Sequence, residues 1–167
     1  MAQVTLQSNP IHTNGELPEV GSAASDFSLT DPKLEEISLD AFKGHKLVLN
    51  IVPSIDTGIC AKSARKFNER ATALENTKVL TISRDLPFAM SRFCAAEGIE
   101  NVVMLSDFRS DFGPTYGVEL VDGPMKGLLA RAIVVLDASH QIVYTELVPE
   151  IAQEPDYDKA VEALQQA

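Results

Sequence analysis

The chain has no tryptophan, only two cysteines, and nine glycines and nine prolines among 167 residues. So few glycines and prolines argue against a long disordered or linker segment. No apolar run approaches the ~18 residues of a membrane helix, and no basic leader with an apolar core opens the chain. We therefore expect a cytoplasmic protein without a membrane partner. In that reducing compartment, two cysteines are expected to be free thiols or a redox pair, not a permanent structural disulfide.

Positive charge is also scarce, since 14 Lys and Arg face 24 Asp and Glu, for a formal net charge of −10. Such a field repels phosphate polymers, and no basic run is present, so no nucleic-acid partner is expected. No His/Cys/Asp group has metal-ligand spacing, and no glycine-rich phosphate loop occurs. We expect neither a metal nor a bound cofactor. His12, His45 and His140 are scattered and form no evident dyad with Cys60.

What the chain has is enough apolar sequence, 45% of its residues, for one globular domain over residues 1–167. Apolar periodicity and turn residues predict a sequence of short elements. These are a hairpin over 3–14 around Asn9-Pro10; short strands at 27–30 and 36–38; a helical turn at 39–42; strands at 46–52, 78–83 and 102–105; helices at 60–76 and 85–97; strands at 130–136 and 141–147; and a helix at 156–166.

Two signals mark the ends of the second long helix. Asp85 is expected to cap its start, and Gly98 is expected to supply the left-handed residue that ends it. The element order is a βαβ unit joined to a ββα unit. This order predicts an α/β, thioredoxin-like fold with a mixed central sheet and an N-terminal β-hairpin. Reactive groups in such sheets gather beyond the carboxyl ends of the parallel strands.

Cys60 falls in that place, between a buried strand and the apolar stripe of a helix. An inert, buried cysteine is the ordinary interpretation of such a position. The first turn of a helix, with unpaired N–H groups and the positive end of the dipole, instead favours a thiolate. Pro53, Thr57 and Cys60 also stand at the spacing Pro-x-x-x-Thr-x-x-Cys, which puts a shielding ring and a hydroxyl near the sulfur. We therefore expect Cys60 to be a nucleophile.

That signature resembles the peroxidatic loop of the peroxiredoxins. The signature as it stands here and three further stretches resemble the bacterial thiol peroxidase branch, an atypical two-cysteine group, and the likeness runs over nearly the whole chain. The stretches are Pro-Ser-Ile-Asp-Thr-Gly-Ile-Cys60, Ser91-Arg-Phe-Cys94, Asp122-Gly-Pro-Met-Lys-Gly-Leu-Leu-Ala-Arg131 and Glu154-Pro-Asp-Tyr157. Ser25 departs from the pattern, because many peroxiredoxins carry proline there.

The resemblance implies a thiol-dependent peroxidase that reduces hydrogen peroxide and organic hydroperoxides. Cys60 matches the peroxidatic cysteine, which becomes a sulfenic acid. Thr57 matches the hydroxyl that hydrogen-bonds the thiolate and the peroxide, and Pro53 matches the proline that covers the pocket. Arg131 matches the arginine that stabilises charge along the breaking O–O bond. Cys94 matches the resolving cysteine of an intramolecular disulfide that thioredoxin reduces, and the branch typically forms homodimers.

Simpler interpretations stay open beside these. Arg131 could be a surface arginine, although its apolar neighbours predict a half-buried side chain that needs an anionic partner. Cys94 could be a small core residue beside Phe93, since no local motif activates it. Ser63 gives a one-thiol version of Cys-x-x-Cys and is expected to be a satisfied helix residue. Two alternative functions are a thiol-disulfide oxidoreductase and a redox-sensing binding protein.

Overall fold

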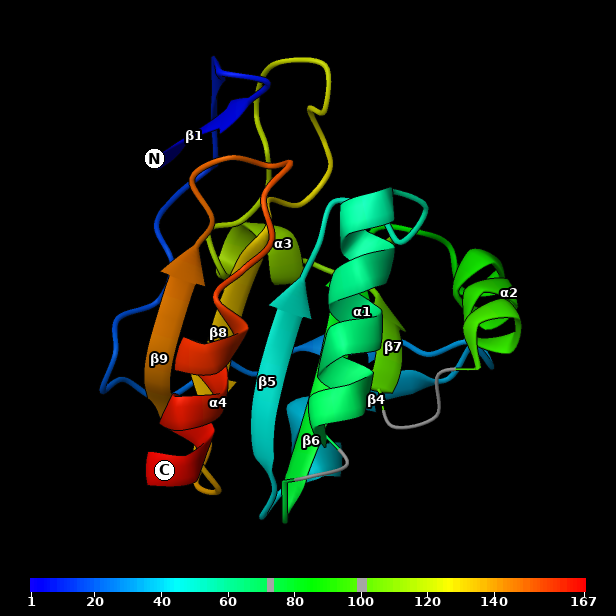
Figure 1. Cartoon of the computed structure of the whole chain (residues 1–167), viewed down its shortest axis with the longest axis vertical. Coiled ribbons are helices and arrows are strands. Elements are labelled where there is room, and N and C mark those ends of the chain that lie inside the picture. The colour runs from blue at the N-terminus through cyan, green and yellow to red at the C-terminus, as the bar shows by residue number, and fades with distance from the viewer. Residues whose placement is uncertain (72–73, 99–101) are drawn as a thin grey trace.

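The central element is a seven-stranded mixed sheet in the order β4-β3-β7-β6-β5-β8-β9 (Figure 1). The computed structural model describes residues 1–71, 74–98 and 102–167. The strands are β3 (Ser28–Thr30), β4 (Glu36–Ser38), β5 (Lys46–Ile51), β6 (Thr77–Ser83), β7 (Val102–Ser106), β8 (Ala132–Leu136) and β9 (Ile142–Leu147). Strands β5, β6 and β7 are parallel, whereas β8 runs antiparallel to β5. The mixed thioredoxin-like sheet predicted from the sequence is confirmed.

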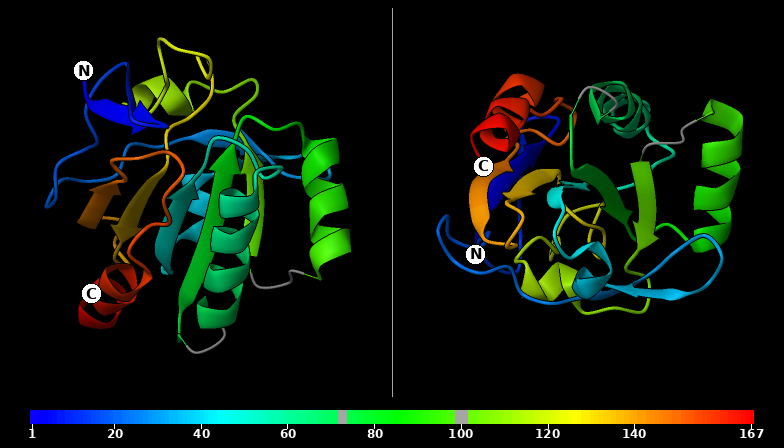
Figure 2. Two further views of the ribbon diagram at one scale, coloured as in Figure 1. Left: turned by 45° about the horizontal axis from the view of Figure 1, so that its top comes forward. Right: turned by 90° about the horizontal axis from the view of Figure 1, so that it is seen from below.

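Helices cover both faces of this sheet. One face carries α1 (Gly58–Ala71), α2 (Pro87–Glu97) and α4 (Tyr157–Gln166), and the other carries the 3-10 turn η1 (Leu39–Phe42) and the short α3 (Phe112–Thr115) (Figure 2). The α1 face contains a buried cluster with Cys60, Phe67 and Tyr157. The opposite face is filled around Phe27 and Phe112. Each face of β5 is therefore covered, which explains the near-continuous apolar character of that strand.

The N-terminal hairpin is present, but its turn lies two residues earlier than the sequence suggested. Strands β1 (Gln3–Leu6) and β2 (Asn9–His12) pair antiparallel, and the turn is formed by Gln7 and Ser8 with φ of 51° and 69°. A two-residue hairpin turn of this kind needs positive φ at both central positions, which proline cannot adopt. Pro10 therefore lies inside β2, opposite Thr5.

Several helix boundaries also differ from expectation. Helix α1 begins at Gly58, two residues before the predicted start, and it ends at Ala71; Asn76, the predicted end, lies in a turn with φ of 55°. Residues 72–73, within that predicted helix, lie outside the described part. Gly98 ends α2 in the left-handed conformation, φ 64°, as predicted. Within the described ranges, none of the helices is long and apolar enough to cross a membrane.

Candidate active site

Four of the five predicted site residues lie next to the end of β5 in the chain or in the sheet: Pro53, Thr57 and Cys60 follow that strand, and Arg131 directly precedes its neighbour β8. The chain leaves β5 at Ile51, passes through the loop 52–57 and enters α1 (Figure 1). Ile51 lies opposite Ala132 in the β5–β8 ladder. Because β8 is antiparallel to β5, its first residues lie at this same end. The register thus places Arg131, directly before β8, beside the start of the loop that leads to Cys60.

Cys60 is fully buried and is the third residue of α1. Its backbone N–H donates to Thr57 Oγ1 at 3.3 Å, and the Thr57 hydroxyl donates to the carbonyl oxygen of Ser54 at 3.1 Å. The first of these is the bond of an N-cap residue to the third residue of a helix. Pro53 is buried at the start of the loop. Local structure therefore joins Thr57 to Cys60 directly and places Pro53 at the start of the same loop, with Cys60 in the first turn at the positive end of the helix dipole.

A buried polar group lies beneath this first turn. The Ser63 hydroxyl donates to the carbonyl oxygen of Cys60 at 3.0 Å and accepts from Asn50 Nδ2 at 3.3 Å. Asn50 Nδ2 also approaches Thr81 Oγ1 at 3.4 Å. Ser63 is thus a satisfied helix residue, as expected. The sequence does not predict Asn50 as a member of this buried hydrogen-bond network, because its neighbours in β5 are apolar.

Arg131 is far more buried than the sequence predicted, with 2% of its surface exposed. Its Nε donates to the carbonyl oxygen of Ile151 at 2.8 Å, and its buried Nη1 has no hydrogen-bond partner within the described residues. Burying a guanidinium N–H without a hydrogen-bond partner destabilises the folded protein. We therefore expect a polar or anionic group to accept a hydrogen bond from it during the reaction. The predicted surface-arginine alternative is wrong.

The segment between β9 and α4 links Arg131 to α1. Ile151 accepts from Arg131, and three residues later the Glu154 carboxylate lies 3.3 Å from Lys62 Nζ on α1. Glu154 also accepts from the Tyr157 hydroxyl at 2.9 Å. Burial and this bond to Glu154 raise the pKa of Tyr157 well above its usual value, and the nearby charge of Arg131 opposes that shift. The Glu154-to-Tyr157 motif thus bridges the two sides of the site.

Cys94 lies on α2, half-buried, and both cysteines are free thiols. Its side chain packs against the same hydrophobic cluster that contains Cys60. Burial raises the pKa of the Cys94 thiol above its ordinary value. In this state Cys94 is therefore a protonated thiol adjoining the core, and it is less nucleophilic than a solvated cysteine.

Asp85 has a role in this site that the sequence did not reveal. Its carboxylate accepts from the Ser54 hydroxyl and from the Ile55 N–H, each at 2.8 Å, and from the Ser83 hydroxyl at 2.5 Å. The predicted function as the cap of α2 is wrong, because Leu86 occupies the cap position and no side chain caps the helix there. Asp85 lies one residue before the cap position, and its carboxylate binds the loop before α1 instead.

A second polar network supports this end of the sheet next to Asp85. Arg84 Nε donates to Asp107 Oδ1 at 3.0 Å, and its Nη1 reaches Glu119 Oε1 at 2.5 Å and the carbonyl oxygen of Gly127. The Asp107 side chain is completely buried and also accepts from the Gly113 N–H at 3.1 Å. Burial raises the pKa of Asp107, and the Arg84 charge partly offsets this.

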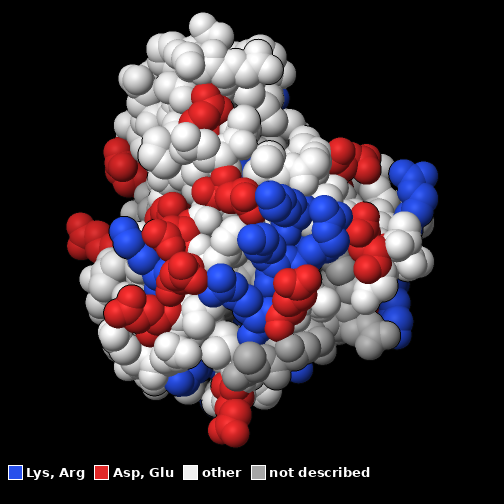
Figure 3. Space-filling view, viewed as in Figure 1, with Lys and Arg blue, Asp and Glu red and all other residues white. Residues whose placement is uncertain are grey.

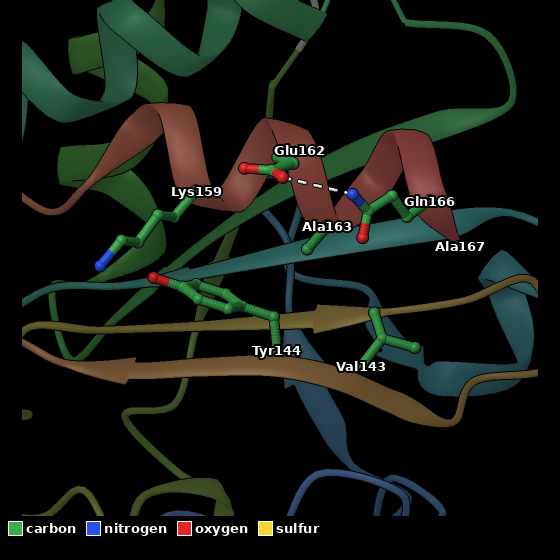
Figure 4. A pocket seen from close by; sticks show the side chains of 7 residues that line it. All are labelled: Val143, Tyr144, Lys159, Glu162, Ala163, Gln166 and Ala167. Atoms are coloured by element: carbon green, nitrogen blue, oxygen red, sulfur yellow. Dashed lines mark hydrogen bonds between the residues drawn. The ribbon is translucent and has the colours of Figure 1, made fainter.

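Two further surface features are a groove beside α4 and a cluster of basic side chains over α1. A groove of about 370 Å³ runs between β9 and α4 and is lined by Tyr144, Lys159 and neighbouring residues (Figure 4), none of them a predicted site residue. Lys and Arg side chains gather over α1, the helix of Cys60, on an otherwise mixed face (Figure 3). Among the described residues, no group of three or more His, Cys, Asp or Glu could hold a metal ion.

A thioredoxin-like sheet with a buried thiol in the first, N-capped turn of a helix defines the class of thiol-based redox proteins. Comparison with known proteins narrows the class. The family model described as Redoxin matches residues 19–161. The chain is 56% identical to a "Thiol peroxidase" of Corynebacterium glutamicum and 59% identical to one of Mycobacterium bovis, in each case over 98% of this chain and 99% of the relative.

Solved structures agree with this assignment. A peroxiredoxin-like protein from Aquifex aeolicus superposes with a TM-score of 0.92 at 37% identity, covering 99% of this chain and 97% of that one. A thiol peroxidase from Chromobacterium violaceum gives the same TM-score and coverage at 23% identity, which supports the fold alone. The chain belongs to the Redoxin family, as a peroxiredoxin of the thiol peroxidase branch.

Proposed function

We propose that the protein reduces hydrogen peroxide and organic hydroperoxides through the Cys60 thiolate. The sulfur attacks the terminal peroxide oxygen, the O–O bond breaks, and water or an alcohol leaves as Cys60 becomes a sulfenic acid. The observation that carries the proposal is the position of Cys60: it is buried in the first, N-capped turn of α1, at the sheet end where Arg131 has an unpaired guanidinium nitrogen.

Each neighbouring residue has a role that follows from its chemistry. Arg131 supplies a fixed positive charge that favours the thiolate and stabilises the negative charge on the departing oxygen. Thr57 holds the first turn and presents its hydroxyl near the sulfur and the incoming peroxide. Pro53 limits access of water to the loop. The burial of Cys60 and Arg131 strengthens the interaction between their charges, since little solvent screens it.

We propose that Cys94 completes the cycle. Its thiolate attacks the sulfur of the Cys60 sulfenic acid, hydroxide leaves and takes up a proton to give water, and an intramolecular disulfide forms. The two Cα atoms must then lie within ~4.4 to 6.8 Å, so α1 and α2 unwind locally around the cysteines. Thioredoxin then reduces the disulfide by thiol exchange. In support, both side chains adjoin the same hydrophobic cluster.

Stopped-flow mixing of the reduced protein with hydrogen peroxide and with cumene hydroperoxide tests the cycle. The first step should vanish in Cys60→Ser and survive in Cys94→Ser, where over-oxidation of Cys60 replaces turnover. Arg131→Ala should slow the first step at least ~10-fold, the equivalent of about 1.4 kcal/mol. A first step that is unchanged in Cys60→Ser would exclude the proposal.

The same measurements separate the two alternatives. A thiol-disulfide oxidoreductase would react with protein disulfides and would not depend on Arg131 or Thr57. A redox-sensing binding protein would react slowly with peroxide and would bind its partner in one redox state only.

A further inference from the structure

We propose that Asp85 is a positioning residue that latches the Cys60 loop shut, and that this latch sets the balance between disulfide formation and over-oxidation of Cys60. The inference rests on the proposed function and adds a control element to it. Asp85 is on neither cysteine's helix and is not adjacent to Cys60 in the sequence. Its influence is exerted through the loop that precedes α1.

The contacts of Asp85 join the loop to the rigid end of the sheet. Oδ1 accepts from the Ser54 hydroxyl, and Oδ2 accepts from the N–H of Ile55, both at 2.8 Å. On the sheet side, Ser83 at the end of β6 donates to Oδ2 at 2.5 Å, and Ser106 at the end of β7 donates to the Asp85 carbonyl at 2.5 Å. Asp85 is therefore fixed by two strands while its carboxylate binds the loop. Hydrogen bonds to an ionised acceptor are stronger than neutral ones.

These bonds continue to the reactive residue through the loop. Ser54, bound by Asp85, accepts at its carbonyl from the Thr57 hydroxyl, and Thr57 in turn accepts from the Cys60 N–H. The first turn of α1 is thus connected to Asp85 by consecutive hydrogen bonds. Moving Cys60 out of its buried position toward Cys94 requires this turn to open. Opening the turn is therefore expected to strain or break the bonds between Asp85 and the loop.

The latch matters because the sulfenic acid has two competing fates. With Cys94 it gives a disulfide and water. With a second peroxide it gives a sulfinic acid, while that peroxide is reduced to water or an alcohol. The first fate needs the open loop, whereas the second needs only the closed one. A stronger latch therefore favours over-oxidation, and a weaker latch favours the disulfide.

Three variants test this inference, with a matched control. Asp85→Ala removes both loop bonds, Asp85→Asn keeps one acceptor oxygen, and Ser54→Ala removes a single bond. Asp56→Ala removes an exposed carboxylate from the same loop and serves as the charge control. Disulfide formation and sulfinic acid at Cys60 are followed by stopped flow and by intact mass over a series of hydrogen peroxide concentrations.

We expect the ratio of the disulfide rate to the over-oxidation rate to rise at least ~10-fold in Asp85→Ala, which corresponds to about 1.4 kcal/mol of favoured opening. Ser54→Ala and Asp85→Asn should give smaller rises. The initial peroxide step should change less than ~3-fold, because the closed loop still predominates when the open form remains a minor population. Asp56→Ala should behave like the wild type.

Amide exchange of the reduced proteins tests the latch without peroxide. Asp85→Ala should lose protection at residues 58–63 and keep it in β5 and β6, whereas general destabilisation would lower both. An unchanged rate ratio in Asp85→Ala and Ser54→Ala, with a normal peroxide step, would overturn the latch and leave the proposed function intact. Absence of any Cys60 reaction in the wild type would instead refute the proposed function. If Asp85→Ala fails to fold, Ser54→Ala decides the question.

Discussion

Replacing Arg84 by methionine should destabilise the folded protein, because it leaves the buried Asp107 carboxylate without its cationic partner. The Asp107 side chain is completely buried, and Arg84 Nε is its cationic partner at 3.0 Å. Methionine preserves much of the apolar length of arginine but removes the charge and the donors. Asp107 then retains the Gly113 N–H at 3.1 Å as a hydrogen-bond donor. Removing one partner of a buried ion pair typically costs ~3–5 kcal/mol.

The expected loss can be expressed as a melting temperature. For a chain of this length, 1 kcal/mol corresponds to roughly 2–4 °C, so Arg84→Met should lower Tm by about 6–20 °C. Arg109 provides the matched control, because its ion pair with Glu36 joins two side chains that are each about half exposed. Exposed pairs of this kind contribute about 0–1 kcal/mol, so Arg109→Met should lower Tm by less than about 4 °C.

The difference in Tm between Arg84→Met and the wild type should become smaller as the pH is lowered. Burial raises the pKa of Asp107, and the Arg84 charge partly offsets that rise, so the variant's pKa should be higher still. A carboxyl whose pKa is higher in the folded than in the unfolded protein is stabilised by protonation. The destabilisation caused by the ionised Asp107 is therefore complete at a pH above its pKa in the folded protein. It disappears as the pH falls toward ~3.9, the pKa of an aspartate in the unfolded protein.

Calorimetry of both variants and the wild type at pH 7 and pH 5 measures these differences. The double variant Arg84→Met/Asp107→Asn should recover at least half of the lost Tm, since the amide keeps an acceptor for Gly113 and carries no charge. The reasoning would be refuted if Arg84→Met cost no more than Arg109→Met, or if the double variant were less stable than the single one.

Three further outcomes are expected. Because burial raises the pKa of Cys94, disulfide formation should keep accelerating above pH ~8.5, where an ordinary thiol is already half ionised, as rapid-quench mass analysis across pH 6–10 would reveal; a profile centred at pH ~8.5 would show that Cys94 is solvated before it attacks. Gly113→Ala should lower Tm, because a Cβ there would lie 2.7 Å from Leu129 Cδ2 and 2.9 Å from Arg84 Nη2; thermal unfolding measures this, and a Tm equal to that of the wild type would contradict the close packing. The pKa of Glu150 is lowered to about 2 by N–H groups that include those of Ala152 and Ser8. The stabilisation of the hairpin by the Glu150 carboxylate should therefore be present above pH ~4.3 and disappear as the pH falls toward 2. Amide exchange of the hairpin should show this acid transition in the wild type and lose it in Glu150→Gln.

Local features of the site could be predicted from the sequence. Pro53, Thr57 and Cys60 are separated by a few residues, and their relation depends only on a strand that ends and a helix that begins. The capping bond from the Cys60 N–H to Thr57 is a direct product of that local geometry. The left-handed Gly98 at the end of α2 was predictable for the same reason.

Non-local features could not be predicted in this way. The burial of Arg131 depends on the register that sets Ile51 opposite Ala132, and on a backbone carbonyl at Ile151 that no side-chain pattern reveals. Asp85 stands two residues before Pro87, and its immediate neighbours predict a helix cap. Its actual partners lie on a loop 30 residues or more earlier in the chain, within reach only after β5 and β6 have paired.

The pairing of β8 with β5 also has a consequence for biosynthesis. The ribosome makes the cysteine early, but the guanidinium and the carbonyl that holds it arrive only with the last third of the chain. Under the proposed function, the site is therefore completed only after the last third of the chain has been synthesised and the segment with Arg131 and Ile151 has docked on β5.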